Sequence, residues 1–257
     1  TAQPLITQSL INNLQILYPP LSEQQRIAEI LETVDNAIEK TDQIIEKYKR
    51  IKQGLMQDLL TKGVVSDELG VMSYELGIMG DNWRLRDEKR DKFKDSPLGK
   101  IPEEWEVVRL GDVATLRNKK TFLILDEKYL GLENIETGTG RLIGYIPSDT
   151  IKGLANIFEE GDVLFGKLRP NLRKFLFAKF RGFCSTEIYV IHTSTSSISK
   201  IFLYFTIISE SFLKLAESKV FGTKMPRTSW EILKTYLFPL PPLPEQQRIA
   251  EILSQID

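Results

Sequence analysis

The chain has very few of the side chains on which catalysis and metal binding usually depend. Its 257 residues include one cysteine, Cys184, and one histidine, His192. A single cysteine excludes an internal disulfide and a zinc site built from several cysteines. A lone histidine leaves no nucleophile–base pair of the usual kind, and the pattern EIYVIHT places it in a predicted strand. The residues therefore predict no catalytic site, no metal site and no cofactor.

Long apolar runs and phosphate-binding signatures are also missing. No run of about 18 apolar residues occurs, so we expect no membrane span. The segment Gly138-Thr139-Gly140 lacks the third glycine of a dinucleotide-binding turn, and there is no Walker-type loop. Hydrophobic residues make up 42% and charged residues 27% of the chain, which is typical of a soluble globular protein. We expect a cytoplasmic location.

What the chain does contain is a duplicated segment. Residues 19–35 read PPLSEQQRIAEILETVD and residues 241–257 read PPLPEQQRIAEILSQID, identical at 13 of 17 positions. A repeat with a long period indicates a duplicated structural unit, here a globular module followed by a helix. We therefore expect the chain to be a fragment, or a half-length form, of a protein with two such modules.

The first copy of the segment opens a long predicted helix over residues 22–63. Ser22 to Gln25 form a capping-box pattern, and Gly63 follows the last turn. Apolar residues recur in a heptad pattern over five heptads, which favours a coiled coil; packing against a globular core is the alternative. The predicted coiled-coil interface consists of Ile27, Leu31, Val34, Ile38, Ile45, Tyr48, Leu55 and Leu59.

The remaining chain is predicted to form an α+β protein, with one mixed α/β domain joined to the long helices. Residues 1–21 are expected to be the tail of a preceding module, 64–95 a linker with a solvated charged run, 96–240 the domain, and 241–257 the start of a second helix. Within the domain we predict strands at 106–110, 145–147, 162–165, 175–180 and 187–192. Predicted helices cover 112–116, 200–217 and 229–234.

Basic residues gather in three segments of this domain. Residues 96–240 contain 20 Lys and Arg against 16 Asp and Glu. Arginine and asparagine suit base edges and lysine suits phosphates, although solvated loops explain such segments equally well. The candidate DNA-binding residues are Arg117, Asn118, Lys119 and Lys120 in the first segment, Lys167, Arg169, Asn171, Arg173 and Lys174 in the second, and Lys224 and Arg227 in the third.

Four segments then carry a resemblance to a known family. They are LGKIPEEWEVVRLGDVA, GDVLFGKLRPNLRK, GTKMPRTSWEILK and PLPPLPEQQRIAEIL, in this order. Together they resemble the specificity subunit of type I restriction-modification systems. The resemblance implies that 96–240 is a target recognition domain reading half of a split DNA site. It also implies that the helices from residues 22 and 241 are the central and distal conserved helices, which form a spacer and dock methyltransferase subunits.

The same resemblance implies a non-catalytic subunit whose partner is double-stranded DNA. Methyl transfer and cleavage would belong to methyltransferase and restriction subunits, which bind S-adenosylmethionine and ATP. A chain with one recognition domain would read half a site, and a homodimer through the spacer helices could restore two. Two alternatives are weighed beside this one: a coiled-coil scaffold without sequence-specific readout, and an autonomous nuclease or methyltransferase, whose motifs are missing.

Overall fold

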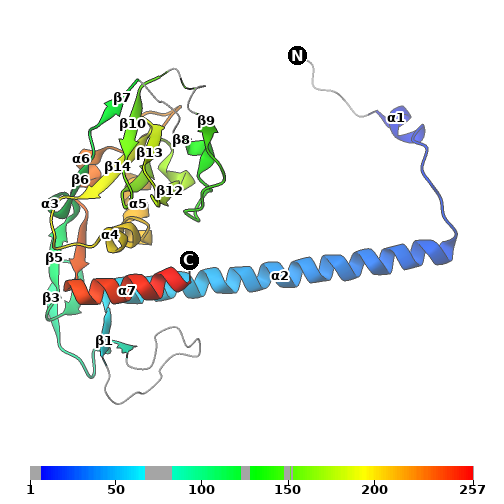
Figure 1. Cartoon of the computed structure of the whole chain (residues 1–257). Helices are drawn as coiled ribbons and strands as arrows, with labels where there is room; N and C mark the ends of the chain where they lie inside the picture. Colours follow the sequence, from blue (N-terminus) through cyan, green and yellow to red (C-terminus); the bar gives the residue numbers. More distant parts are fainter. Residues whose placement is uncertain (1–6, 67–82, 123–127, 148–150, 152, 257) are drawn as a thin grey trace. The chain divides into compact units, whose positions relative to one another are not determined.

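The computed structural model describes residues 7–66, 83–122, 128–147, 151 and 153–256 (Figure 1). It divides into two compact units, 1–51 and 52–257, and the boundary falls inside one long helix. Among the described residues, no helix is both long enough and apolar enough to cross a membrane.

The first unit contains α1 (Gln8–Asn12) and most of α2 (Leu21–Thr61). The predicted long helix is confirmed, and it ends before Gly63, whose φ is +65°. The predicted Ser22 cap is wrong, because α2 already begins at Leu21 and Ser22 lies inside its first turn. The Gln24 side-chain amide donates to the Pro19 carbonyl oxygen at 2.7 Å. The backbone N–H groups of Glu23 and Gln24 donate to the Pro20 carbonyl oxygen.

The predicted coiled-coil seam is buried at one end only. Leu55 and Leu59, in the second unit, are 9% and 0% exposed. The other six side chains of the seam are between 45% and 59% exposed; they are Ile27, Leu31, Val34, Ile38, Ile45 and Tyr48. Within the described part of the chain no second helix covers them, so the coiled coil stays a prediction.

The second unit is built on two sheets, which confirms the mixed α/β prediction. The four-stranded antiparallel sheet has the order β12-β11-β14-β6, with β6 (Ala114–Leu116), β11 (Val163–Gly166), β12 (Phe175–Phe177) and β14 (Ile188–Thr193). The five-stranded sheet has the order β7-β10-β13-β8-β9, with β7 (Lys120–Thr121), β8 (Lys128–Leu130), β9 (Ile146–Pro147), β10 (Ala155–Phe158) and β13 (Gly182–Ser185). Its β13–β8 pair is parallel.

Three antiparallel strand pairs complete the described strands. They are β1 (Val64–Ser66) with β2 (Trp83–Leu85), β3 (Phe93–Ser96) with β4 (Gly99–Pro102), and β5 (Glu106–Arg109) with β15 (Leu237–Leu240). The described helices of this unit are α3 (Leu110–Val113), α4 (Lys200–Ile207), α5 (Glu210–Ser218), α6 (Trp230–Leu233) and α7 (Leu243–Gln255), with short 3-10 turns η1 (Leu132–Asn134) and η3 (Pro170–Leu172).

Two helix predictions need correction. The predicted helix 112–116 is wrong because helix α3 ends at Val113 and the next three residues pair with β14 as strand β6. The predicted helix 200–217 is two helices. Ser209 has an extended backbone, with ψ 145°, and its hydroxyl oxygen accepts the N–H of Phe212 as the cap of α5. A locally capping serine therefore divides a segment that is rich in apolar residues on both sides of it.

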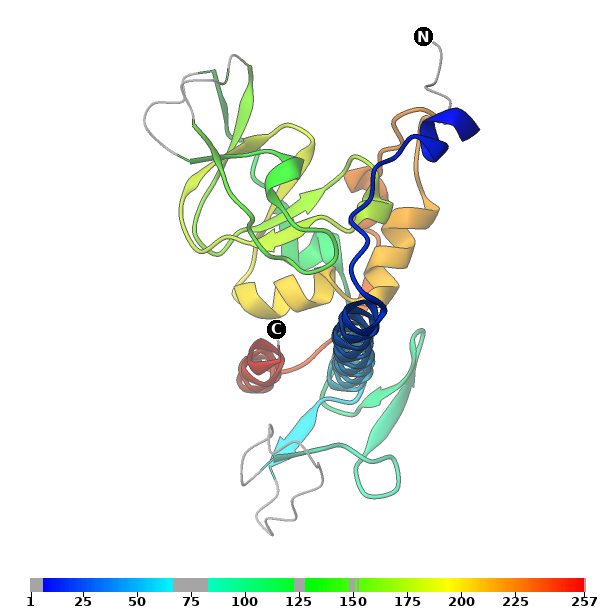
Figure 2. The same ribbon diagram turned by 90° about the vertical axis from the view of Figure 1, so that its right-hand side faces the viewer.

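The four-stranded sheet buries both of its faces. Val163 and Phe165 face a cluster formed with α4, α5 and α7, whereas Leu164, between them, faces the five-stranded sheet and packs in a second cluster with Leu130 and Phe158. Alternation along a strand explains this division. Figure 2 shows α7 beside α4.

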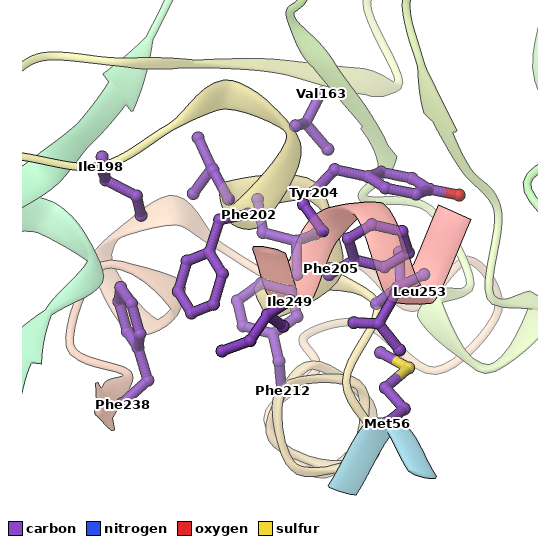
Figure 3. Close-up of a cluster of buried hydrophobic side chains, with 14 of the residues drawn as sticks. Met56, Val163, Ile198, Phe202, Tyr204, Phe205, Phe212, Phe238, Ile249 and Leu253 are labelled. Carbon is purple, nitrogen blue, oxygen red and sulfur yellow. The ribbon is translucent and has the colours of Figure 1, made fainter. Parts of the chain in front are cut away.

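The first cluster also ties the end of α2 to the second unit. In Figure 3, Phe202 and Phe205 of α4 lie against Ile249 and Leu253 of α7, and Met56 of α2 closes one side. All five side chains are 9% exposed or less. Residues 52–61 of α2 are therefore part of this unit's core.

The charged run before the domain is not the solvated connector that the sequence predicts. Arg84 forms two bonds to the Asp91 carboxylate, at 2.7 and 2.8 Å, and Arg86 pairs with Glu245 of α7. The side chains of Arg86 and Glu245 are 10% and 8% exposed. These charges therefore fix β2 to the rest of the unit. Residues 67–82 of the predicted linker lie outside the described residues.

Candidate nucleic-acid interface

The densest basic segment forms the loop between β11 and β12, here called the 167–173 loop. Its 3-10 turn is flanked by Arg169 and Arg173, whose φ angles are 50° and 47°. In the described part of the chain these are the two non-glycine residues with positive φ. Such conformations cost about 1–3 kcal/mol each and persist only where the surroundings impose them; they are concentrated at functional sites.

Helix α5 imposes the conformation at Arg173. The Arg173 guanidinium donates to both oxygens of Glu210, at 2.8 and 3.0 Å, and to Glu217 at 2.7 Å. The hydrogen bond from Arg173 lowers the pKa of the Glu210 carboxyl, and both carboxylates raise the pKa of Arg173. Arg173 therefore anchors the loop, and its donors are engaged within the protein.

A second basic segment runs alongside this loop. Residues 220–227, here called the 220–227 hairpin, are closed by two backbone bonds between Phe221 and Arg227, at 2.8 and 2.9 Å. The N–H of Arg169 donates to the Pro226 carbonyl oxygen at 2.7 Å, and the N–H of Thr228 donates to the Lys167 carbonyl oxygen at 3.0 Å. Two segments separated by about 50 residues thus form one continuous surface.

Arg227 fixes the hairpin from its base. Its guanidinium binds both oxygens of Glu187, at 2.8 and 3.2 Å, and also donates to the Met225 carbonyl oxygen at 3.2 Å. The bond from Arg227 holds the pKa of Glu187 below its ordinary value. Arg227, like Arg173, is tied to a carboxylate of the protein.

The basic segment 117–120 lies apart from this surface. Arg117 forms a bidentate pair with Asp162, at 2.7 and 2.9 Å, and Asp162 is only 1% exposed. This pair anchors β6 to the turn before β11. Lys120 lies on β7, an edge strand of the five-stranded sheet, and Lys119 precedes it. The structure therefore brings two of the three predicted segments together. In the remaining segment, Arg117 follows β6 of the four-stranded sheet, whereas Lys120 lies on the five-stranded sheet.

The predicted binding residues fall into two groups. The first group makes contacts within the protein. The arginines Arg117, Arg173 and Arg227 pair with carboxylates, Lys174 donates to the Ile135 carbonyl oxygen at 2.7 Å, and Lys167 lies over the Tyr189 ring. The second group is exposed and, among the described residues, makes no side-chain hydrogen bond or ion pair; it contains Asn118, Lys119, Lys120, Arg169, Asn171 and Lys224.

Sequence reasoning missed the apolar residues of the hairpin. Phe221 is 62% exposed, Met225 is 46% exposed and Val220 is 40% exposed. The sequence did carry a signal for this exposure. These apolar residues lie between Lys219 and Arg227 without the period of a helix or a strand, so no buried face accounts for them.

Comparison with known proteins agrees with the sequence motifs. The family described as type I restriction modification DNA specificity domain matches residues 1–50 and 102–257. The chain belongs to this family. The resemblance given by the four motifs is thereby confirmed.

Individual relatives are similar along nearly the whole chain. The type I restriction enzyme MjaVIII specificity subunit of Methanocaldococcus jannaschii is 28% identical, over 100% of this chain and 58% of the relative. The type I restriction enzyme EcoDI specificity subunit of Escherichia coli is 28% identical, over 98% of this chain and 57% of the relative. The chain thus spans a little over half the length of these two specificity subunits.

One solved structure shows the same fold. A chain from work on complex assembly and conformational transition of the type I R-M system aligns with a TM-score of 0.51 and 18% identity, over 100% of this chain and 57% of that chain. The HsdS subunit from Thermoanaerobacter tengcongensis aligns with a TM-score of 0.48 and 19% identity, over 100% of this chain and 56% of that chain.

Proposed function

We propose that this chain recognises a short double-stranded DNA sequence, one half of a split site, for a type I restriction-modification complex. The observation that carries the proposal is the joining of the 167–173 loop to the 220–227 hairpin by backbone hydrogen bonds. The joined surface presents Arg169, Asn171 and Lys224 to solvent. Membership of the specificity family supports the same function.

The contacts within the protein assign different roles to the predicted residues. Arg169 and Asn171 are free to read base edges, because arginine pairs with guanine and asparagine with adenine in the major groove. Lys224, and Lys119 and Lys120 at the β7 edge, are free to neutralise phosphates. Arg173 and Arg227 are positioning residues, since carboxylates of the protein already occupy their guanidinium groups.

The chain would act without chemistry of its own, in the cytoplasm. Methyl transfer and cleavage would be carried out by methyltransferase and restriction subunits of the complex. The alternative, a scaffold without sequence readout, does not explain why strained backbone and unpaired Arg169 and Asn171 occur together at one loop.

We further propose that the exposed stripe on α2 docks partners. Apolar side chains that are about half exposed over several turns, such as Ile38 and Ile45, are typical of an unformed helix–helix interface. A methyltransferase subunit, or a second copy of the chain, would cover them. Sedimentation of the chain with a type I methyltransferase subunit tests this: Ile38→Glu should weaken association, whereas Lys40→Glu, at an exposed position outside the seam, should not.

Selection from a randomised duplex library tests the recognition function. The chain is used together with a type I methyltransferase subunit, and enriched duplexes are sequenced. We expect one short motif, or a two-part motif if two chains pair. Arg169→Ala should relax preference at one position, by about 1–3 kcal/mol, while Lys94→Gln on β3 should leave the motif unchanged. Formation of the complex without any enrichment would favour the scaffold alternative.

A further inference from the structure

The tip of the 220–227 hairpin is apolar although it lies on a basic, exposed surface. Phe221 and Met225 are 62% and 46% exposed, and two exposed lysines, Lys219 and Lys224, lie close to them in the chain. Neither apolar side chain belongs to a buried cluster of the described residues. Their exposure therefore calls for a ligand that offers apolar and anionic groups together.

The hairpin is held firmly enough to present these side chains in one place. Gly222, with φ +85°, makes the turn after Phe221. Phe221 is bonded through its backbone to Arg227, and the Arg227 guanidinium binds Glu187 and the Met225 carbonyl oxygen. Since the Pro226 carbonyl oxygen accepts the N–H of Arg169, the apolar tip keeps a fixed position beside the predicted base-reading loop.

We propose that Phe221 and Met225 contact thymine methyl groups in the major groove and so help to set the recognised sequence. This inference rests on the proposed function. The C5 methyl of thymine is the apolar group that a base pair offers in the major groove, beside the donors and acceptors that arginine and asparagine read. The tip thus supplies the apolar part of a reading surface whose polar part is Arg169 and Asn171.

The flanking charges favour DNA over a protein as the occupant. Lysine is depleted in protein–protein interfaces, whereas it is the usual neutraliser of phosphates next to a base contact. Lys219 lies two residues before Phe221, and Lys224 lies directly before Met225. Each apolar side chain therefore has a lysine close to it in the chain, as expected where a base contact lies next to a phosphate contact.

Library selection followed by methyl deletion tests this inference. The motif is first selected with the unaltered chain and a type I methyltransferase subunit. Each thymine of the motif is then replaced by deoxyuridine, which lacks the methyl group. Binding is measured for the unaltered chain and for the variants Phe221→Ala and Met225→Ala.

Loss of one buried methyl group should weaken DNA binding by the unaltered chain about fourfold. At least one variant should not respond to the replacement at that position. Leu98→Ala, an exposed apolar position between β3 and β4, is the matched control and should respond like the unaltered chain.

Each outcome decides the matter. A methyl effect that disappears in Phe221→Ala or Met225→Ala supports the inference. A motif without thymine, a motif insensitive to deoxyuridine, or variants that keep the full methyl effect would overturn it while leaving sequence recognition intact. Failure of the unaltered chain to enrich any motif would overturn sequence recognition and, with it, this inference.

Discussion

Glu245, at the start of α7, offers the sharpest test of how the second unit is held together. Its carboxylate accepts hydrogen bonds from Arg86, from the Trp105 indole N–H at 2.9 Å and from the Val64 N–H at 2.9 Å. The side chain is 8% exposed, and that of Arg86 is 10% exposed. Glu245→Gln would remove the buried ion-pair partner of Arg86, leaving it the exposed Glu104 carboxylate at 3.8 Å, and would turn an amide N–H₂ toward donors. Removing one partner of a buried pair costs about 3–5 kcal/mol.

The duplicated segment supplies a matched control. Glu23 occupies the same place in the first copy, two residues after the start of its helix, and is exposed. Any interaction with the helix dipole is shared by both positions and amounts to less than about 1 kcal/mol. Glu23→Gln should therefore change the free energy of unfolding far less than Glu245→Gln, although the exchange is chemically identical.

Urea unfolding followed by tryptophan fluorescence measures the difference, since Trp83, Trp105 and Trp230 all lie in the second unit. With a slope of about 3 kcal/mol per molar urea for a unit of this size, Glu245→Gln should lower the midpoint by about 1–2 M. Glu23→Gln should lower it by less than about 0.3 M, at a protein concentration where sedimentation shows a monomer. Equal shifts for the two variants would refute the argument that the Glu245 site fixes this unit.

Two further predictions concern the basic surface. Lys224→Gln should weaken binding to all duplexes alike and reduce the slope of log K against log salt by about 0.9, whereas Lys94→Gln should not; a change of sequence preference instead would place Lys224 on a base. Lowering the pH should loosen the same surface, because Arg227 and Arg173 lower the pKa of Glu187 and Glu210 below the ordinary 4.5 in the folded chain. Their contribution to the free energy of unfolding is then complete above that pH and is lost as the pH falls through the lowered pKa. Glu187→Gln should show a shallower loss of stability than the unaltered chain as the pH falls below about 5, and an identical loss would contradict the pairing.

The parts of the fold that sequence predicted well are those with a local cause. The helix stop at Gly63 needs only a left-handed backbone, which glycine adopts freely. The strands β5, β11 and β14 follow apolar patterns within a few residues. The site residues were harder to assign, because Arg173 and Asn171 look alike as loop residues in the sequence. Arg173 is anchored because Glu210 and Glu217 of α5 lie beside it, whereas Asn171 has no such partner among the described residues. The sequence alone does not show this difference.

Some of the parts that sequence missed depend on partners far along the chain. The charged run around Arg84 and Arg86 reads as solvated because most such runs are, and nothing near it indicates that Arg86 meets Glu245, 159 residues later. The hairpin β3–β4 and the apolar tip at Phe221 were missed for a different reason, because their pairing partners are only a few residues away. Their places follow from backbone pairing, for which the sequence carries little periodic signal.

The two copies of the repeated segment separate local from distant causes within one molecule. Helices α2 and α7 begin at equivalent residues, Leu21 and Leu243, 222 positions apart. In both, a glutamine side chain donates to the carbonyl oxygen five residues earlier, Gln24 to Pro19 at 2.7 Å and Gln246 to Pro241 at 2.8 Å.

The surroundings of the two copies nevertheless differ completely. Gln246 also bonds Ser197 and Ser199, and Ile249, Ile252 and Leu253 are at most 1% exposed. The equivalent side chains of the first copy, Ile27, Ile30 and Leu31, are 45–58% exposed. The segment alone therefore suffices to start the helix, whereas burial of its apolar face requires a folded module packed against it. If the first-copy face binds such a module, Ile30→Glu should abolish that association while leaving the unfolding midpoint of the second unit unchanged.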